Sequence, residues 1–422
     1  MPTKPGGVRA AADDPVARRI RSLPKRFLSA SINGLAAVWE LRIDEHAYAV
    51  SVVSGECRVS DGPAVEPNAT IATDATTWLA MDAGGLMGIE AFLDRRLRVG
   101  GNLDLAVRLQ SLFRPHGRPA RPSDLQQIEV EVEGARLSAY VVGTGPPLLL
   151  LHGLGGTKIS WLPIVPALSS SYRLVIPDLP GHGESDKPRT DYSMRAYAHS
   201  VRVLMDATGL RQAVVLGNSM GGRIALELAI RSPQRVTALA LLDPAVPGLR
   251  WRYLAGFTRV FPSGLGPVSF PLRRRWMEAA VRNLFAHPER LPPEAITAAA
   301  GEFVRIYSEP AARLAFASSL RHLVTERPGP FWASMRRVRQ PAMVVFGDRD
   351  RLVPARYGAE LASHLHHGEL HFLPDVGHVP QFEATEETLA LVEPFLARVL
   401  AAQADPWSER LTPPPGPRPG PR

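Results

Sequence analysis

The stretch VVLGNSMGGRIALELA, residues 214–229, decides how the second half of the chain folds. An apolar run ends in Gly-Asn-Ser-Met-Gly, and an amphipathic helix pattern begins directly after it. A turn this tight between a strand and a helix leaves room only for small residues, such as Gly217 and Gly221, beside its central residue. It holds Ser219 strained and exposed, and the helix N-terminus behind it favours negative charge. We therefore predict that Ser219 is a nucleophile.

Apolar runs alternate with helical patterns from about residue 126 onward. The first two alternate apolar and polar residues and predict half-buried strands, while most later ones are nearly continuous apolar runs. The predicted strands cover residues 128–132, 137–141, 148–151, 174–176, 213–216, 238–242, 342–346 and 369–373. Buried strands that alternate with helices pair in parallel, in a sheet covered on both faces. The pattern therefore predicts an α/β fold with a mostly parallel sheet.

His378 is the predicted base, since a serine hydroxyl is a poor nucleophile until a base takes its proton. It lies in PDVGHVPQFE, in a short loop after the last predicted strand. Such a loop delivers its side chain to the carboxyl edge of the sheet, and the chain order serine, acid, histidine fits this arrangement. The other histidines lack that placement.

The chain from residue 126 to about residue 402 resembles the α/β-hydrolase superfamily once DLPGHGESDKP, residues 178–188, is added to these motifs. The resemblance implies hydrolysis without a cofactor or a metal. Dehalogenases and epoxide hydrolases among the relatives need a carboxylate nucleophile, where this chain has Ser219. Relatives that hydrolyse carbon–carbon bonds share GNSMGG but commonly have tryptophan after the catalytic histidine, where this chain has Val379. The segment GHVPQFE is more similar to esterases and lipases.

Three aspartates are candidates for the acid that fixes the imidazole tautomer of the base. The segment VVFGDRDRLVP offers Asp348 and Asp350 at the end of a predicted strand. We choose Asp350, because it fits the G-x-x-D-x-x-V-P pattern of related hydrolases, with Pro354 just behind it. Asp348 is then a turn residue, since Gly-Asp favours turns. Asp243 is a third candidate, because some relatives draw their acid from that strand.

Two backbone N–H groups are predicted to stabilise an oxyanion in this fold, one directly after the nucleophile and one after the third strand. These belong to Met220 and, in LLLLHGLGG, to Leu154. The glycines of that segment let the backbone approach a substrate. We interpret His152, in the same segment, as a structural hydrogen-bonding residue.

The strand and helix rhythm stops between residue 244 and about residue 341. Helical patterns broken by prolines in this segment are typical of a cap over a site. Its aromatic residues are Trp251, Tyr253, Phe257, Phe261, Phe270, Trp276, Phe285, Phe303, Phe316 and Trp332. We expect most of them to pack the core of the cap and a few to line an apolar acyl pocket.

A separate α+β pattern precedes this part of the chain, in residues 15–113. Antiparallel strands are predicted at 38–43 and 48–52, followed by a helix capped by Asp74, a helix at 86–93, a strand at 97–99 and a helix at 103–113. The run DGPAVEPNATIATDATTWLAMDAGGLMGIEAFLDRRLRVGGNLDLAVRLQSLF, from Asp61 to Phe113, resembles the second half of a sterol carrier protein 2 (SCP2) domain. That family implies lipids held in an apolar tunnel. An ordinary core needs the same residues, so lipid binding and a packed accessory domain both stay open.

Two proline-rich stretches mark the boundaries of the domains. RPHGRPARPS, residues 114–123, is typical of a linker, and LTPPPGPRPGPR at the end of the chain is typical of a disordered tail. The predicted order is a tail at 1–14, an SCP2-like domain at 15–113, the linker, a hydrolase domain at 124–402 and a tail at 403–422. If the front domain only binds and delivers lipid, we expect the hydrolase domain to fold without it.

The formal charge of +8 does not indicate a nucleic-acid partner. The chain has only four lysines, so nearly all the positive charge comes from arginines scattered along the sequence. Clusters such as Arg336, Arg337 and Arg339 are interpreted as solvated helix faces. Peripheral contact with lipid stays open, as does the oligomeric state.

A cytoplasmic location is the expectation from the sequence. Its start has no signal peptide pattern, and no stretch is long and apolar enough for a transmembrane segment. The single cysteine, Cys57, forms no intramolecular disulfide and offers no cysteine-based metal site.

The leading hypothesis is a serine hydrolase that cleaves a carboxylic ester, apolar or lipid-like, through an acyl-serine intermediate. Two alternatives remain, a lipid carrier with a vestigial hydrolase fold and a hydrolase of carbon–carbon bonds. The carrier is disfavoured because the elbow, the acid loop and the histidine loop are all intact. The predicted partner is a small-molecule ester or a lipid-like substrate.

Overall fold

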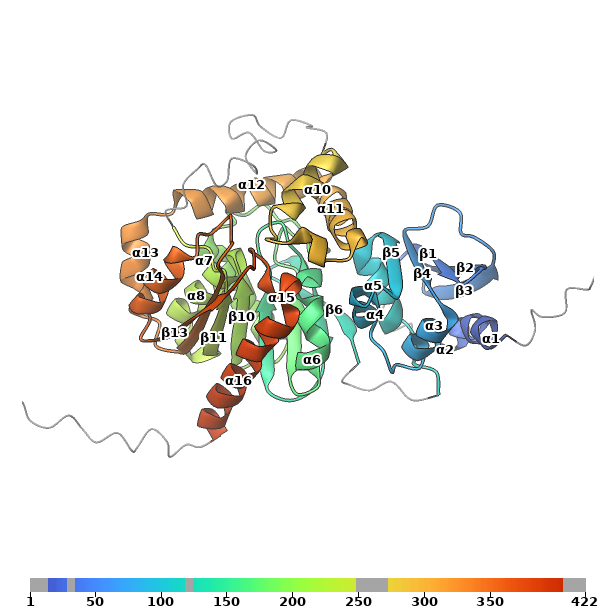
Figure 1. Cartoon of the computed structure of the whole chain (residues 1–422), viewed down its shortest axis with the longest axis horizontal. Helices are drawn as coiled ribbons and strands as arrows, with labels where there is room; N and C mark the ends of the chain where they lie inside the picture. The colour runs from blue at the N-terminus through green and yellow to red at the C-terminus, as the bar shows by residue number, and fades with distance from the viewer. Residues whose placement is uncertain (1–13, 29–34, 118–123, 248–271, 405–422) are drawn as a thin grey trace, which may run out of the picture.

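The computed structural model describes residues 14–28, 35–117, 124–247 and 272–404. Two domains lie side by side (Figure 1), the front domain at 14–117 and the main domain at 124–404. No helix among these residues is long and apolar enough to cross a bilayer. The predicted tails lie almost entirely outside the described residues, apart from Asp14, which caps the first helix, and residues 403 and 404, which end the last one.

The front domain is a five-stranded sheet with helices against it, and its strand order is β3-β2-β1-β4-β5. Its elements are α1 (Pro15–Arg21), α2 (Leu23–Arg26), β1 (Ala37–Ile43), β2 (His46–Val53), β3 (Glu56–Asp61), β4 (Ala69–Thr73), α3 (Ala75–Asp82), α4 (Gly88–Leu93), β5 (Leu97–Gly101) and α5 (Leu103–Ser111). Strands β1 and β4 are parallel, and the other neighbours are antiparallel.

Helix caps fix the second half of the front domain, and of these the cap at Asp74 was predicted from the sequence. Asp74 accepts a hydrogen bond from the N–H of Thr77 at 2.8 Å, and Asn102 accepts one from the N–H of Leu105 at 3.1 Å. Such caps satisfy backbone donors that a helix leaves open. Strand β3 was not predicted, because most of its residues are exposed and polar at the edge of the sheet.

The main domain is an eight-stranded sheet in the order β13-β12-β11-β10-β8-β9-β7-β6. Its strands are β6 (Gln126–Val132), β7 (Ala135–Val142), β8 (Pro147–Leu151), β9 (Arg173–Pro177), β10 (Ala213–Asn218), β11 (Val236–Leu242), β12 (Pro341–Gly347) and β13 (His367–Leu373). Its helices are η2 (Lys158–Ile164), α6 (Val165–Ser169), α7 (Met194–Ala207), α8 (Met220–Arg231), η3 (Pro233–Arg235), α10 (Arg274–Arg282), η4 (Pro288–Arg290), α11 (Pro293–Tyr307), α12 (Pro310–Thr325), α13 (Pro328–Met335), α14 (Arg356–His364), α15 (Pro380–Glu383) and α16 (Thr385–Ala404).

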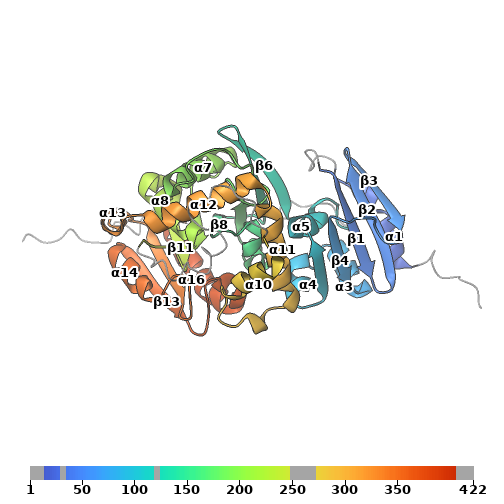
Figure 2. The same cartoon turned by 90° about the horizontal axis from the view of Figure 1, so that it is seen from above.

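The mostly parallel α/β sheet is confirmed. Only β7 is antiparallel to its neighbours, β6 and β9. Alternate residues of the apolar strands face two separate cores, so Val215 packs with α7 and α8, and Leu216 packs with α6 and α16. Figure 2 shows α7 and α8 on one side of the sheet and α16 on the other. This division explains why a strand buried on both faces is apolar throughout.

One strand differs from its prediction. The alternation at 137–141 predicted a half-buried strand, but nearly all of β7 is buried. Strand β7 lies between β6 and β9, so even its small and polar positions, such as Ser138, are covered.

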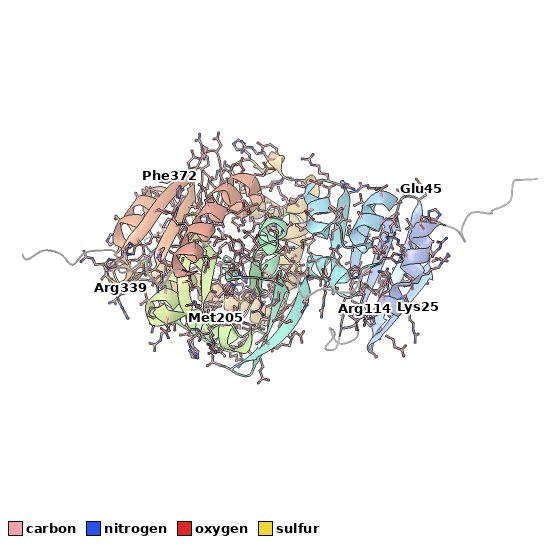
Figure 3. All side chains as sticks on the ribbon, turned by 90° about the horizontal axis from the view of Figure 1, so that it is seen from below. Lys25, Glu45, Arg114, Met205, Arg339 and Phe372 are labelled. Carbon is pink, nitrogen blue, oxygen red and sulfur yellow. The ribbon has the colours of Figure 1, made fainter. Side chains whose placement is uncertain are left out.

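The arginine cluster at residues 336, 337 and 339 is exposed, as expected, but it follows the end of α13 and does not lie on a helix face. Figure 3 shows Arg339 at the periphery of the main domain, far from the front domain.

The two domains share a buried polar contact that we call the domain seam, made of Asp104, Tyr140, Lys158 and Asp178. The ammonium Nζ of Lys158 lies 2.7 Å from Oδ1 of Asp104 and 2.6 Å from Oδ2 of Asp178. The hydroxyl of Tyr140 donates to the same Asp104 oxygen at 2.6 Å. Because Asp104 belongs to α5 of the front domain and the others to the main domain, the domains are docked rather than loosely tethered.

Charges in the seam stabilise one another. Burial alone would lower the pKa of Lys158, but the carboxylates of Asp104 and Asp178 outweigh it and hold that pKa above its usual value. Burial alone would raise the pKa of Asp104, but Lys158 holds it below its usual value. The seam is therefore an ion pair in the folded chain.

Candidate active site

Ser219 lies at the turn between β10 and α8, with φ 54° and ψ −117°. It is the only residue from 213 to 230 that is not buried. The turn depends on its glycines, since a Cβ on Gly221 would lie 2.0 Å from the carbonyl oxygen of Leu151. A Cβ on Gly217 would lie 2.6 Å from the backbone of Gly221. The strained backbone and the half-buried side chain fit the predicted elbow, although an exposed serine was expected.

His378 and Asp350 meet at the carboxyl edge of the sheet. Nδ1 of His378 lies 2.7 Å from Oδ2 of Asp350, and both residues are buried. Oδ1 of Asp350 accepts hydrogen bonds from the N–H groups of Leu352 and Val353, at 2.7 and 3.0 Å. Asp350 lies in the loop after β12, and His378 lies in the loop after β13. These strands are parallel neighbours, so the topology brings the two side chains together.

Asn218 and Leu284 hold the His378 loop in place. Asn218, directly before Ser219, donates from Nδ2 to the carbonyl oxygen of His378 at 3.0 Å. The N–H of His378 donates to the carbonyl of Leu284, just after α10, at 2.7 Å. Ser219 and His378 line the same cavity. We call Ser219, Asp350 and His378 the edge cluster.

The other two candidate acids are placed differently. Oδ1 of Asp348 accepts the N–H of Asp375 at 2.7 Å, as a turn residue would, and its side chain is 42 % exposed. Asp243 is fully buried beside the edge cluster, and its Oδ1 accepts the N–H of Gly347 at 3.0 Å. Of the three aspartates, Asp350 is the one whose side chain forms a hydrogen bond with His378.

The surroundings of Asp243 favour its neutral form. Burial, and then the neighbouring carboxylate of Asp350, raise the pKa of Asp243 well above its usual value. Asp243, Asp350 and His378 offer nitrogen and oxygen atoms within 4.8 Å of one another, a spacing that suits a cation. Three of their four carboxylate oxygens, however, already accept hydrogen bonds. The group is better described as two neighbouring buried carboxyl groups behind an imidazole.

The predicted oxyanion residues flank Ser219. Met220 begins α8, where backbone N–H groups have no helical partner. Leu154 follows β8, which pairs with β10, so the loop after β8 reaches the same edge as Ser219. A Cβ on Gly153 would lie 3.2 Å from the Cβ of Ser219, which shows how closely the two segments approach.

His152 makes structural contacts, as the sequence analysis interpreted it. Its Nδ1 lies 2.8 Å from the carbonyl oxygen of Gly153, and its Nε2 accepts the N–H of Leu179 at 3.0 Å. Burial lowers the pKa of His152 to about 4, so the imidazole is neutral and its tautomer is fixed. It braces the loop that carries Leu154.

A cavity of about 840 Å³ opens beside Ser219, Leu154 and His378. Residues of the cap helices α10, α11 and α12 line it, and Figure 1 shows these helices along the top of the main domain. Of the cap aromatics, Phe285 and Phe303 line the cavity, and the others that are described do not. Trp251, Tyr253, Phe257, Phe261 and Phe270 lie outside the described residues.

Sequence reasoning missed two features of this region. The cavity is also lined by residues of the front domain, such as Phe92 and Val99. The partners of Lys158 and Asp178 in the seam were missed as well, because contacts between segments so far apart leave no local pattern. The one available signal was Asp178 at the start of the motif DLPGHGESDKP.

Family models match both domains. Residues 146–385 match the alpha/beta hydrolase fold, and residues 18–114 match the SCP-2 sterol transfer family.

Curated relatives and solved structures agree with the first match. The 2-hydroxymuconate semialdehyde hydrolase of Pseudomonas sp. (strain CF600) is 30% identical over 65% of this chain and 95% of its own. A structure described as a membrane phospholipase A, a bacterial virulence factor, has a TM-score of 0.57 at 27% identity, over 66% of this chain and 87% of its own. A putative lipase from Acinetobacter baumannii AYE has a TM-score of 0.59 at 24% identity, over 67% of this chain and 94% of its own. This likeness shows the fold alone.

Proposed function

Since the chain belongs to the alpha/beta hydrolase fold family, as the match over residues 146–385 indicates, we propose that it hydrolyses a carboxylic ester through an acyl intermediate on Ser219. The observation that carries this proposal is the 2.7 Å bond between His378 and Asp350, beside an apolar cavity that Ser219 also lines. The enzyme is thus a hydrolase that acts on a small molecule.

In the first half of the reaction, the hydroxyl oxygen of Ser219 attacks the ester carbonyl carbon while Nε2 of His378 takes its proton. The negative oxygen that forms is stabilised by the N–H groups of Leu154 and Met220. His378 then gives its proton to the alcohol oxygen, the C–O bond breaks, and the alcohol leaves.

In the second half, water attacks the acyl carbon, and His378 takes a proton from that water. The bond to Ser219 breaks, and the serine oxygen recovers the proton from His378. Asp350 keeps the proton of Nδ1 facing itself and stabilises the positive imidazole that forms in each half. The products are a carboxylic acid and an alcohol.

A carbon–carbon bond hydrolase is the second candidate, favoured by the similarity to the 2-hydroxymuconate semialdehyde hydrolase. We rank it below the ester hydrolase because Val379 follows His378, and because the cavity is apolar and large. The lipid-carrier alternative is disfavoured by the intact hydrogen bonds of the edge cluster.

Labelling with a fluorophosphonate and mass spectrometry of the labelled peptide test the proposal. We expect labelling at Ser219 in the native chain and none in Ser219→Ala, which should also lose ester turnover by several orders of magnitude. A folded protein that resists labelling, or a Ser219→Ala variant with full esterase activity, rules the proposal out. Turnover of a vinylogous diketone without turnover of any ester selects the second candidate.

A further inference from the structure

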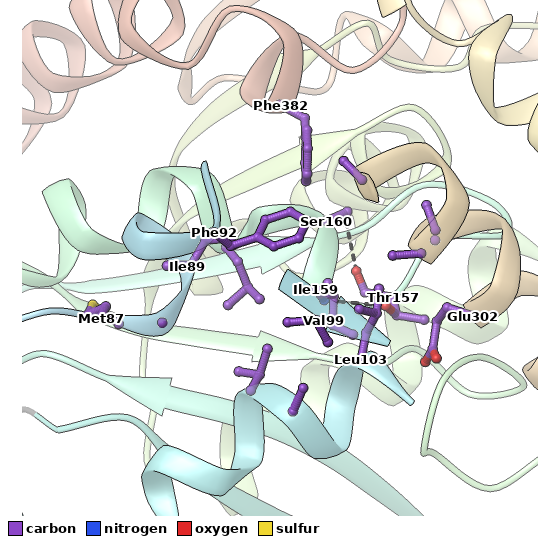
Figure 4. Close-up of a pocket in the computed structure, with 18 of the residues that line it drawn as sticks. Met87, Ile89, Phe92, Val99, Leu103, Thr157, Ile159, Ser160, Glu302 and Phe382 are labelled. Carbon is purple, nitrogen blue, oxygen red and sulfur yellow. Dashed lines mark hydrogen bonds between the residues drawn. The ribbon is translucent and has the colours of Figure 1, made fainter. Parts of the chain in front are cut away.

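The cavity at Ser219 continues into the front domain without a dividing wall. Its lining begins at Ser219 and His378, passes under the cap, and includes Phe92 of α4, Val99 of β5 and Val107 of α5. Figure 4 shows Ile89, Phe92 and Val99 of the front domain gathered around the same space as Ile159, Ser160 and Phe382 of the main domain. One volume therefore spans both domains.

The walls on both sides of the domain boundary are apolar and packed against each other. Phe92 joins an apolar cluster with Phe285 and Ile296 of the main domain. Ile89 and Val107 pack against the core on one face of the main sheet. These contacts make the lining apolar where the domains meet, which suits a ligand made mostly of hydrocarbon.

The amide of Gln110 on the front-domain wall is already bonded to the backbone. The side-chain nitrogen of Gln110 donates to the carbonyl oxygens of Met81 and Leu86, and its Oε1 accepts the N–H of Gly88 at 2.9 Å. An amide that is bonded in this way offers little recognition to a polar ligand. Beside it, Ile89, Phe92 and Val99 offer a ligand apolar contact.

The docking of the two domains is fixed by the domain seam. Lys158 belongs to η2, and its neighbours at 153–157, 159 and 160, directly before and within η2, line the chamber next to Ser219. Its ion pair with Asp104 of α5 therefore holds both halves of the chamber in one arrangement. A ligand can extend across the boundary without the domains moving.

We propose that the two domains form one binding chamber, and that a long-chain acyl ester lies across it, with its carbonyl at Ser219 and its hydrocarbon chain in the front domain. The inference rests on the ester hydrolysis proposed above and adds its substrate class. The front domain is then part of the binding site of the enzyme. It is not a carrier that releases lipid to a separate site.

Chain-length kinetics of two valine variants test this chamber in the full chain. Val99→Phe places a ring in the front half of the chamber, and Val65→Phe makes the same change at a position 87 % exposed. The ring displaces roughly two or three methylene groups of a long chain, which should lower kcat/KM for a palmitoyl ester by roughly 10- to 100-fold. Turnover of the acetyl ester should change little, and Val65→Phe should match the native chain on both esters. Equal effects of Val99→Phe on both esters, or on neither, overturn the shared chamber.

A pair of photoreactive palmitate analogues separates this inference from the proposed chemistry. One analogue carries its diazirine beside the carboxylate and the other carries it at the far end of the chain. We expect the first to label the loops that carry Ser219 or His378, and the second to label residues 86–110. Labelling of the main domain alone by both analogues overturns the chamber, even if esters are hydrolysed. Labelling as expected in a chain that hydrolyses no ester leaves the chamber standing and rejects the proposed function.

Discussion

The edge cluster and the domain seam are both buried polar groups, but the chain assembles them in opposite ways. The edge cluster comes from three loops of one sheet, and each loop has a recognisable sequence of its own. The seam joins Asp104 to Lys158 across two domains, and neither residue stands in a pattern that points to the other. Chemistry is thus encoded locally here, whereas docking is encoded only by the complete fold.

The edge cluster and the domain seam also differ in whether their charges change during the reaction. In the edge cluster, Asp350 faces an imidazole that must gain and lose a proton, next to Asp243, which is kept neutral. In the seam, every shift favours a permanent ion pair. Substitutions in the edge cluster should therefore change rate, and those in the seam should change stability.

The largest expected effect is that of Asp350→Asn. The variant keeps the shape of the side chain but loses the carboxylate that orients His378, so kcat for an ester should fall by about 10⁴-fold. Its thermal unfolding should change little. The matched control is Asp348→Asn, which retains an oxygen for the N–H of Asp375 and should be nearly as active as the native chain. A large loss in the control instead of the variant would move the acid to Asp348.

Lys158→Met should have the largest effect on stability. It leaves Asp104 and Asp178 buried without their shared counter-charge, which should lower the free energy of unfolding by about 3–5 kcal/mol in denaturant titrations. Lys25→Met, at an exposed position of α2, should change it by less than about 0.5 kcal/mol. Equal stability of the two variants would show that the seam does not fix the docking.

Tyr140→Phe probes the same seam with a smaller change. The ring stays in place, but Asp104 loses a hydrogen bond of 2.6 Å, so the free energy of unfolding should fall by about 1–3 kcal/mol. Ester turnover at saturating short substrate should stay as in the native chain. A drop in kcat without a change in stability would contradict the separation of the two clusters.

Asp243→Asn should have the smallest effect on rate, because an amide replaces a carboxyl group that is already neutral. In the native chain, the unfolded state loses the Asp243 proton above pH about 3.9 and the folded state keeps it, so this residue makes stability fall as pH rises toward the raised pKa. The variant should lose that component, and its free energy of unfolding should fall less over this range. A loss of kcat as large as that of Asp350→Asn would make Asp243 the acid.

Most of the main domain could be predicted from the sequence, because its parallel strands are apolar on both faces and its elbow needs specific glycines. The choice of Asp350 required a family pattern, since Asp348 stands in the same short loop. Strand β3 was missed because an exposed edge strand has no apolar periodicity. The burial of β7 was underestimated because only its neighbours in the sheet cover it.

The relation between the domains could not be predicted. A proline-rich linker indicates separation, and its first residues do fold back on the front domain, where the N–H of His116 donates to the carbonyl of Asp82. The contact with the main domain, however, depends on where α5 and η2 meet in space. Charges such as Asp104 and Lys158 are ordinarily exposed, so nothing in the sequence distinguishes them from surface residues.

The buried ion pair of Lys158 also limits how the two domains can be exchanged or rebuilt. A hydrolase grafted onto another lipid-binding module would place its lysine opposite a surface without Asp104, and the oxyanion loop that starts at Gly153 would lose part of its support. A front domain expressed alone would carry Asp104 into water together with an open apolar groove. For protein engineering, the pair should be treated as a single unit, in which any graft must carry α5 together with η2.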